Sequence, residues 1–186
     1  MRVAVDPGHG MSNKTQGVYD PGATCETGGV RYEEADINLE YGLSLKNVFQ
    51  QRGHQVFMTR KNNTDQAPVG KRAGSAEAEG CDVFISLHVN SVNDSHANGL
   101  EVLYVESEDL AQKLKDALIA GTGLKDHGIH YRDDLAVLKF NGPVVLVELG
   151  FIKNDHDRNF LLIPENRQLI CTTIADVVEK AVPKGG

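Results

Sequence analysis

Short apolar runs alternate with segments of helical period along the whole chain, and no other feature constrains the fold as strongly. The apolar runs, which are typical of buried strands, cover residues 2–5, 54–59, 82–90, 100–105, 135–139 and 144–149. The helical segments, which carry an apolar stripe on one face, cover residues 33–52, 68–79, 107–120 and 164–181. This order predicts an α/β fold with helices on both faces of a mixed, mostly parallel twisted sheet. The link before residues 100–105 is short, so we expect that strand to run antiparallel to a neighbour.

Length and composition fit one domain spanning residues 1–186. A chain of this length with 40% hydrophobic residues can bury a full core. The net charge is −7 and no basic cluster interrupts the sequence, so we expect no binding to nucleic acid or anionic lipid. No exposed heptad or apolar edge argues for assembly, and we expect a monomer.

Cellular location is also constrained. No apolar run approaches the roughly 20 residues that a membrane-spanning helix needs, and the amino terminus shows neither a charged leader nor a cleavage site. We therefore expect no membrane insertion, and synthesis in the cytoplasm without a signal peptide. The three cysteines, Cys25, Cys81 and Cys171, are scattered, which predicts neither a disulfide framework nor a CxxC zinc site.

Two histidines stand at the ends of predicted strands. His9 follows the first strand and lies between Gly8 and Gly10, while His88 closes the run "VFISLH". Ligands of open α/β sheets bind beyond the carboxyl ends of the strands, so both histidines are expected at that edge. A lone histidine at a strand end is more often structural than functional. These two histidines indicate a functional site only if further metal-binding or acid–base groups lie beside them.

Two glutamates supply such groups. Glu148 lies inside the apolar run "VVLVELGF", and burying an ionised carboxylate costs several kcal/mol unless it is paired or metal-bound. Glu34 begins the first predicted helix at the same edge, although Glu33 and Glu34 would equally well complement the helix dipole. Two imidazoles and a carboxylate are zinc ligands, and a second carboxylate nearby can act as a base.

Five segments in order resemble one known family. They are "VAVDPGHG", "EADINLEYGLSL", "VFISLHVNS", "GLEVLYV" and "PVVLVELGFIKN", and they are similar to motifs of the zinc-dependent N-acetylmuramoyl-L-alanine amidases of the Amidase_3 type. The resemblance spans nearly the whole chain. It implies an α/β fold around a mixed sheet, one Zn²⁺ ion, and cleavage of the amide bond between N-acetylmuramic acid and L-alanine in peptidoglycan.

The resemblance also implies roles for individual residues. His9, Glu34 and His88 match the zinc ligands, and Glu148 matches the catalytic glutamate that moves a proton from the attacking water to the leaving nitrogen. Glu34 rather than Glu33 fits because the family pattern is a glutamate, one residue, and then "DINL". Ala35 departs from the pattern, since lysine is frequent there.

Other polar residues near these motifs are candidates for contact with the substrate. Asn90, just past His88, is predicted either to contact the substrate or to cap the strand. His127 and His130 lie in a polar link, residues 125–134, and are expected to face solvent or substrate rather than metal. The glycine-rich segment 10–32 is expected to form a long loop beside the substrate groove.

The resemblance also suggests a biological setting. A compact catalytic domain without a leader resembles a bacteriophage endolysin that reaches the cell wall through a holin-made lesion. The alternatives are the catalytic domain of a bacterial autolysin or sporulation amidase, and a zinc peptidase acting on wall peptides. A wall-binding domain with structural zinc is disfavoured, because such sites usually fill four positions with protein ligands and no cysteine lies in the motifs.

Overall fold

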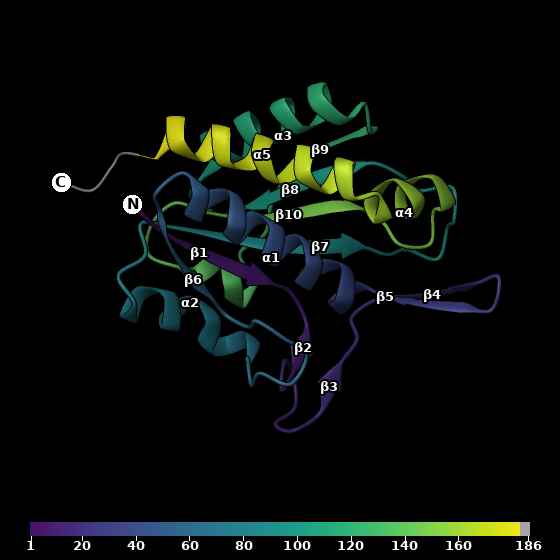
Figure 1. The fold of residues 1–186 in the computed structure, drawn as a ribbon, viewed down its shortest axis with the longest axis horizontal. Coiled ribbons are helices and arrows are strands. Elements are labelled where there is room, and N and C mark those ends of the chain that lie inside the picture. The colour runs from purple at the N-terminus through teal and green to yellow at the C-terminus, as the bar shows by residue number, and fades with distance from the viewer. Residues whose placement is uncertain (183–186) are drawn as a thin grey trace.

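The computed structural model describes residues 1–182, which build a six-stranded sheet with helices on both faces (Figure 1). The strands of this sheet are β1 (Arg2–Pro7), β6 (Gln55–Met58), β7 (Val83–Asn90), β8 (Leu100–Tyr104), β9 (Asp126–Tyr131) and β10 (Val144–Phe151). Their spatial order is β6-β1-β7-β10-β8-β9. All neighbours are parallel except β8 and β10, which are antiparallel. The predicted α/β class, the mixed sheet and the reversed strand are confirmed.

The helices form two unequal layers. The larger layer contains α1 (Glu34–Gln51), α3 (Glu108–Thr122), α4 (Asp155–Leu162) and α5 (Pro164–Ala181). The other face is covered by α2 (Val69–Ala78) and the short 3₁₀ helix η1 (Ala136–Lys139). Side chains of β1 alternate between the layers, with Val3 and Val5 facing the larger one and Ala4 facing α2. Each strand thus contributes to both halves of the core.

Local sequence explains where the main helices begin and end. The apolar stripe of α1, which includes Tyr41 and Leu45, is fully buried, and the helix ends just before Gly53, whose φ of 82° is unfavourable for other residues. Pro164 occupies the first turn of α5, where its missing N–H costs no helical hydrogen bond. Within residues 1–182, no helix is both long enough and apolar enough to cross a bilayer. The last four residues of the expected domain lie outside the described part.

Residues 135–139 do not form the predicted strand. They contain η1, whose Val137 and Leu138 are buried against α2 and β10. A short apolar run fits strand and helix periods equally well. The place beside β8 is taken by β9, which lies in the segment predicted to be a polar link. Its polar composition misled the prediction because β9 is an edge strand that is only partly buried.

Two further features differ from the prediction. The segment 10–32 is not one continuous loop: it contains the paired strands β2 (Gly10–Met11) and β3 (Tyr19–Asp20), followed by most of the hairpin of β4 (Thr24–Thr27) and β5 (Val30–Glu33). This hairpin projects from the body of the protein in Figure 1. The helix α4 was not predicted, although Asn154 caps it by accepting a hydrogen bond from the backbone N–H of Asp157.

Candidate metal centre

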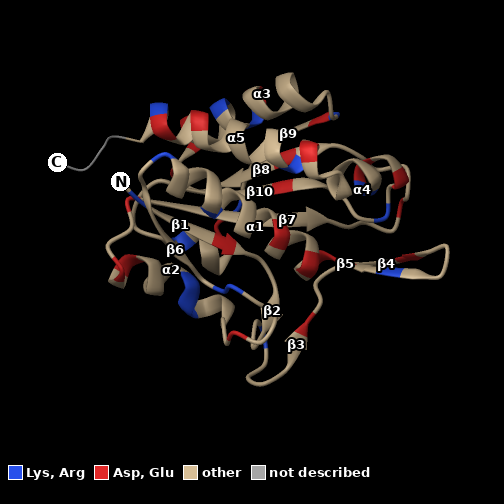
Figure 2. Ribbon diagram, viewed as in Figure 1, with Lys and Arg blue, Asp and Glu red and all other residues tan. Residues whose placement is uncertain are grey.

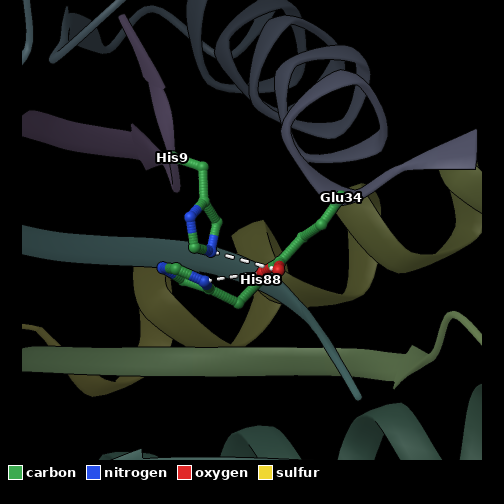
Figure 3. A group of neighbouring side chains, drawn as sticks. All are labelled: His9, Glu34 and His88. Atoms are coloured by element: carbon green, nitrogen blue, oxygen red, sulfur yellow. Dashed lines mark hydrogen bonds and ion pairs between the residues drawn. The ribbon is translucent and has the colours of Figure 1, made fainter. Parts of the chain in front are cut away.

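Three side chains from distant parts of the sequence meet beyond the carboxyl ends of β1 and β7 (Figure 3). His9 follows β1, Glu34 opens α1, and His88 lies near the end of β7. Nε2 of His9 lies 3.1 Å from Oε2 of Glu34, and Nδ1 of His88 lies 2.8 Å from Oε1 of the same carboxylate. The three potential ligand atoms lie within 4.8 Å of one another, which is close enough to hold a metal ion. The predicted convergence of these residues is therefore present.

Two glycines leave the space that this convergence requires. A Cβ atom at Gly8 would lie 2.3 Å from the ring of His88, and one at Gly22 would lie 2.6 Å from Oε2 of Glu34. Both distances are far shorter than atoms tolerate. His9 itself has a φ of 64°, an uncommon value for a residue with a side chain. The backbone is thus shaped to bring the imidazoles and the carboxylate together.

Glu34 is the most buried member of the cluster, with 4% of its surface exposed. The backbone N–H of Ala23 donates to its Oε2 at 2.8 Å, and that of Val89 donates to its Oε1 at 3.1 Å. Burial alone would raise the pKa of this carboxyl, but His88 and His9 outweigh burial and hold the pKa below its ordinary value. Glu34 is therefore ionised at neutral pH. The acidic residues of this first turn of α1 appear as red ribbon in Figure 2.

Asp20, on β3, fixes the orientation of His9. Its Oδ2 lies 3.1 Å from Nδ1 of the imidazole, on the side away from Glu34, and it accepts a hydrogen bond from Nδ2 of Asn13 at 2.7 Å. Burial lowers the pKa of His9, but Glu34 and Asp20 together raise it above its ordinary value. A carboxylate on the far nitrogen is the usual partner of a metal-binding imidazole. Sequence reasoning missed Asp20; the available signal was that Asp20-Pro21-Gly22 repeats the turn Asp6-Pro7-Gly8.

Glu148 lies beside this cluster without belonging to it. It is the register partner of His88, on the neighbouring strand β10. The side chain is partly exposed as a whole, but its Oε2 is shielded from solvent and has no hydrogen-bond partner. Burial raises the pKa of Glu148 well above its ordinary value, with the charges of Glu34 and Glu101 acting in the same direction. An unpaired carboxyl group next to an imidazole can accept and release a proton.

A second carboxylate, that of Glu101, lies on the strand next to Glu148. Glu101 of β8 is its antiparallel register partner, and Oε1 of Glu101 accepts a hydrogen bond from Nδ2 of Asn90 at 2.7 Å. His130 approaches the other oxygen of Glu101 at 3.3 Å. Glu101 was not predicted, although a charged residue inside "GLEVLYV" is the same signal that identified Glu148. The side-chain nitrogen of Asn90 is thus already hydrogen-bonded within the protein. The predicted contact of Asn90 with the substrate stays a prediction.

Within residues 1–182, His9, Glu34 and His88 are the one group of His, Cys, Asp or Glu that could hold a metal ion. Its donor set of two imidazoles and a carboxylate, with one imidazole oriented by Asp20, fits a transition-metal ion. His127 and His130 lie on β9, outside this group. A cavity of about 200 Å³ borders both ligand histidines and is lined by mostly apolar side chains from α2, η1 and β10.

Known proteins are similar to this chain in sequence and in fold. Residues 3–180 match the family model described as N-acetylmuramoyl-L-alanine amidase. The probable cell wall amidase LytH of Staphylococcus epidermidis is 30% identical over 176 residues, which cover 94% of this chain and 56% of LytH. The germination-specific N-acetylmuramoyl-L-alanine amidase of Bacillus subtilis is 27% identical over 198 residues, which cover 92% of this chain and 76% of that protein. The chain thus spans about half the length of LytH and somewhat more of the germination amidase.

Solved structures agree with this match over the full length of a catalytic domain. The catalytic domain of CwlV, an N-acetylmuramoyl-L-alanine amidase from Bacillus (Paenibacillus) polymyxa, superposes with a TM-score of 0.84 at 28% identity and 96% coverage of both chains. The amidase AmiC2 of Nostoc punctiforme gives a TM-score of 0.84 at 29% identity, covering 97% of this chain and 96% of AmiC2.

Proposed function

The chain belongs to the N-acetylmuramoyl-L-alanine amidase family, and from that membership we propose that it hydrolyses the amide bond between N-acetylmuramic acid and L-alanine in peptidoglycan, with one Zn²⁺ ion as cofactor. The observation that carries the proposal is the convergence of His9, Glu34 and His88, with the unpaired carboxyl group of Glu148 beside them. Three protein ligands and one free carboxyl group are the groups that a zinc hydrolase needs.

In this proposal His9, Glu34 and His88 hold the zinc ion. Two nitrogen donors and one carboxylate oxygen suit zinc, and structural zinc sites usually take four protein ligands, whereas this cluster supplies three. A zinc ion held there would polarise the scissile carbonyl group and make water more acidic. Asp20 holds Nδ1 of His9, which leaves Nε2 as the nitrogen that would bind the metal.

Glu148 is the proposed proton carrier. Its Oε2 has no partner and accepts the proton of the water that attacks the lactyl carbonyl carbon of the muramic acid. The same oxygen then gives that proton to the alanine nitrogen as the amide bond breaks. Burial raises the pKa of Glu148 above its ordinary value, and a carboxyl group that holds a proton more tightly is a better proton acceptor in the first step.

The apolar cavity beside His9 and His88 is the proposed place for groups that flank the amide bond. Asn90 stays the proposed polar contact to the substrate. Its Nδ2 donates to Glu101, and its Oδ1 accepts from the backbone N–H of Ser91 at 2.7 Å. A stem peptide would therefore donate to the second lone pair of Oδ1. Glu101 in turn holds Asn90 in place.

Product analysis tests the reaction. Purified peptidoglycan is digested, and the soluble fragments are identified by mass spectrometry. The proposal predicts free peptides that begin with L-alanine, together with uncut glycan strands. Cleavage between two amino acids would instead identify a zinc peptidase. A chelator should stop the hydrolysis, and continued binding to the wall without any cleavage by the zinc-loaded protein would identify a wall-binding module.

For the biological setting, we propose a phage or prophage endolysin that is made in the cytoplasm and released to the wall by a holin. The alternative is a bacterial autolysin or sporulation amidase, which the B. subtilis germination amidase among the relatives favours. Expression in a susceptible host with and without a holin separates the two: lysis that requires the holin supports the endolysin. We also propose that the protein acts as a monomer, for which light scattering should give a mass of 20.3 kDa.

A further inference from the structure

Arg60 is the largest fully buried side chain among the described residues, with 1% of its surface exposed. Burying a guanidinium group is costly unless every donor is satisfied. Within residues 1–182, its hydrogen-bond acceptors are three backbone carbonyl oxygens and the side chain of Asn63, with no carboxylate among them. Burial, together with the charge of Arg72, lowers the pKa of Arg60 to about 10, so the group stays cationic at neutral pH. A buried cation without a bonded anion calls for an explanation.

The acceptors of Arg60 lie next to two of the proposed zinc ligands. Nε donates to the carbonyl oxygen of Pro7 at 2.8 Å. Nη2 donates to the carbonyl oxygen of Gly8 at 2.8 Å and to that of Ala35 at 2.7 Å. Gly8 directly precedes His9, and Ala35 directly follows Glu34. One nitrogen atom therefore joins the end of β1 to the first turn of α1.

The backbone around His9 is adapted to this side chain. A Cβ atom at Gly10 would lie 2.8 Å from Cδ of Arg60, and the φ of Gly10 is 95°. The two glycines that flank His9 thus serve different neighbours: Gly8 makes room for His88, and Gly10 makes room for Arg60. The uncommon backbone conformation of His9 needs such surroundings to persist.

We propose that Arg60 is a positioning residue for the metal centre, which sets the separation of His9 and Glu34 by holding the backbone beside both. The inference rests on the proposed zinc site. Planar geometry matters as well as charge, because the fork of the guanidinium group reaches several carbonyl oxygens at once and an ammonium group does not. Removing the fork should loosen the ligand geometry and weaken zinc binding, while the rest of the core stays packed.

The experiment compares Arg60→Met and Arg60→Lys with Arg158→Met. Arg158 is also buried, but it donates to the carbonyl oxygen of Ile152, to Asp155 and to Sγ of Cys25. Its guanidinium group also lies over the ring of Tyr32. None of these residues is a proposed ligand or directly precedes or follows one. Zinc affinity is measured by chelator competition, the ligand geometry by the absorption spectrum of the Co²⁺-loaded protein, and folding by the thermal midpoint without metal.

We expect Arg60→Met to weaken zinc binding by about 10- to 100-fold and to change the Co²⁺ spectrum, with a smaller loss for Arg60→Lys. Arg158→Met should lower the thermal midpoint but keep the zinc affinity and the spectrum of the unaltered protein. If the unaltered protein binds no zinc, the proposed function fails.

If the unaltered protein binds zinc and the Arg60 variants match it in affinity and spectrum, the role of Arg60 is wrong. The proposed role of Arg60 is also wrong if Arg158→Met loses as much zinc affinity as Arg60→Met. Should Arg60→Met fail to fold, Arg60→Lys decides by the same readouts. Should neither fold, Arg60 serves the fold as a whole and the proposal is overturned.

Discussion

Glu148 and His88 lie side by side in register on the parallel strands β10 and β7. Among the buried carboxyl oxygens of residues 1–182, Oε2 of Glu148 is the one without a hydrogen-bond partner, and its residue lies next to a proposed zinc ligand. We predict that Glu148→Gln lowers the rate of peptidoglycan hydrolysis by roughly 10²–10⁴-fold, because the amide cannot carry the proton. Zinc content should stay at one ion per chain. Both are measured on the same preparation, by release of L-alanine amino termini and by atomic emission.

The matched control for this variant is Glu165→Gln, which alters an exposed glutamate at the start of α5. It should hydrolyse the wall at the rate of the unaltered protein. If Glu148→Gln keeps its rate with full zinc occupancy, another group moves the proton.

The close approach of Gly8 to His88 leads to a second prediction. The Cβ atom of Gly8→Ala would lie 2.3 Å from the imidazole, so the ring or the backbone must move. We expect the protein to lose zinc affinity and about 1–3 kcal/mol of stability through overpacking. Gly74→Ala in α2, where nothing lies within 4 Å, should instead raise the free energy of unfolding by up to about 1 kcal/mol. Chelator competition and urea unfolding check both; equal zinc affinity in the two variants would contradict the steric argument.

The contact between Asp20 and His9 supports a third prediction. Asp20→Asn keeps the size of the side chain but removes the charge that holds Nδ1 of His9. We expect zinc affinity to fall by about 10- to 100-fold, as for other carboxylates that orient metal-binding histidines. Asp176→Asn, an exposed change on α5, serves as the control. An Asp20 variant with unchanged affinity would show that His9 needs no such partner.

The sequence offers most guidance at a charged residue inside an apolar run and along a long amphipathic helix. Glu148 became a candidate because an ionised carboxylate inside an apolar strand needs a reason, and its catalytic role stays a prediction. The apolar stripe and the closing glycine predicted α1 to within one residue at each end. Glu34 could be separated from Glu33 only through the family resemblance, since helix-dipole arguments treat both alike.

Other features depend on partners that are distant in the sequence. The run 135–139 contains η1 instead of a strand, and β9 forms the edge of the sheet beside β8; no local pattern reveals this arrangement. Asp20 became a partner of His9 only through the pairing of β2 with β3. Arg60 lies on no predicted motif, and its role depends on the spatial meeting of β1, β6 and α1. Such relationships are tertiary, and single-sequence patterns do not encode them.

The buried pair of Asp6 and Arg72 supports a fourth prediction, on stability. Nη1 of Arg72 lies 2.7 Å from Oδ1 of Asp6, and both side chains are almost fully buried. Asp6→Asn leaves the guanidinium group without its anion, which should cost about 3–5 kcal/mol in the free energy of unfolding. Asp109→Asn, which breaks the exposed pair with Lys113, should cost less than about 1 kcal/mol. Urea unfolding at neutral pH measures the free energy of unfolding of both variants. Equal losses would contradict the prediction that breaking the buried pair costs more than breaking the exposed one.

The same pair predicts a dependence on pH. Burial alone would raise the pKa of Asp6, but Arg72, Thr59 and Ser86 outweigh it and hold the pKa below its ordinary value. The unfolded chain takes up this proton near pH 3.9, so the stabilisation is complete above about pH 5. It is lost as the pH falls through the lower pKa of the folded protein. The stability difference between the unaltered protein and Asp6→Asn should therefore shrink in acid, and a constant difference would contradict this sign.

X-ray diffraction from zinc-loaded crystals, measured at the zinc absorption edge, tests the proposed metal site directly. We predict a single anomalous peak per chain, bonded to His9, Glu34 and His88, with the carboxyl group of Glu148 close to the side of the ion that these ligands leave open. A peak bonded to other residues, or a fourth protein ligand closing that side, would contradict it.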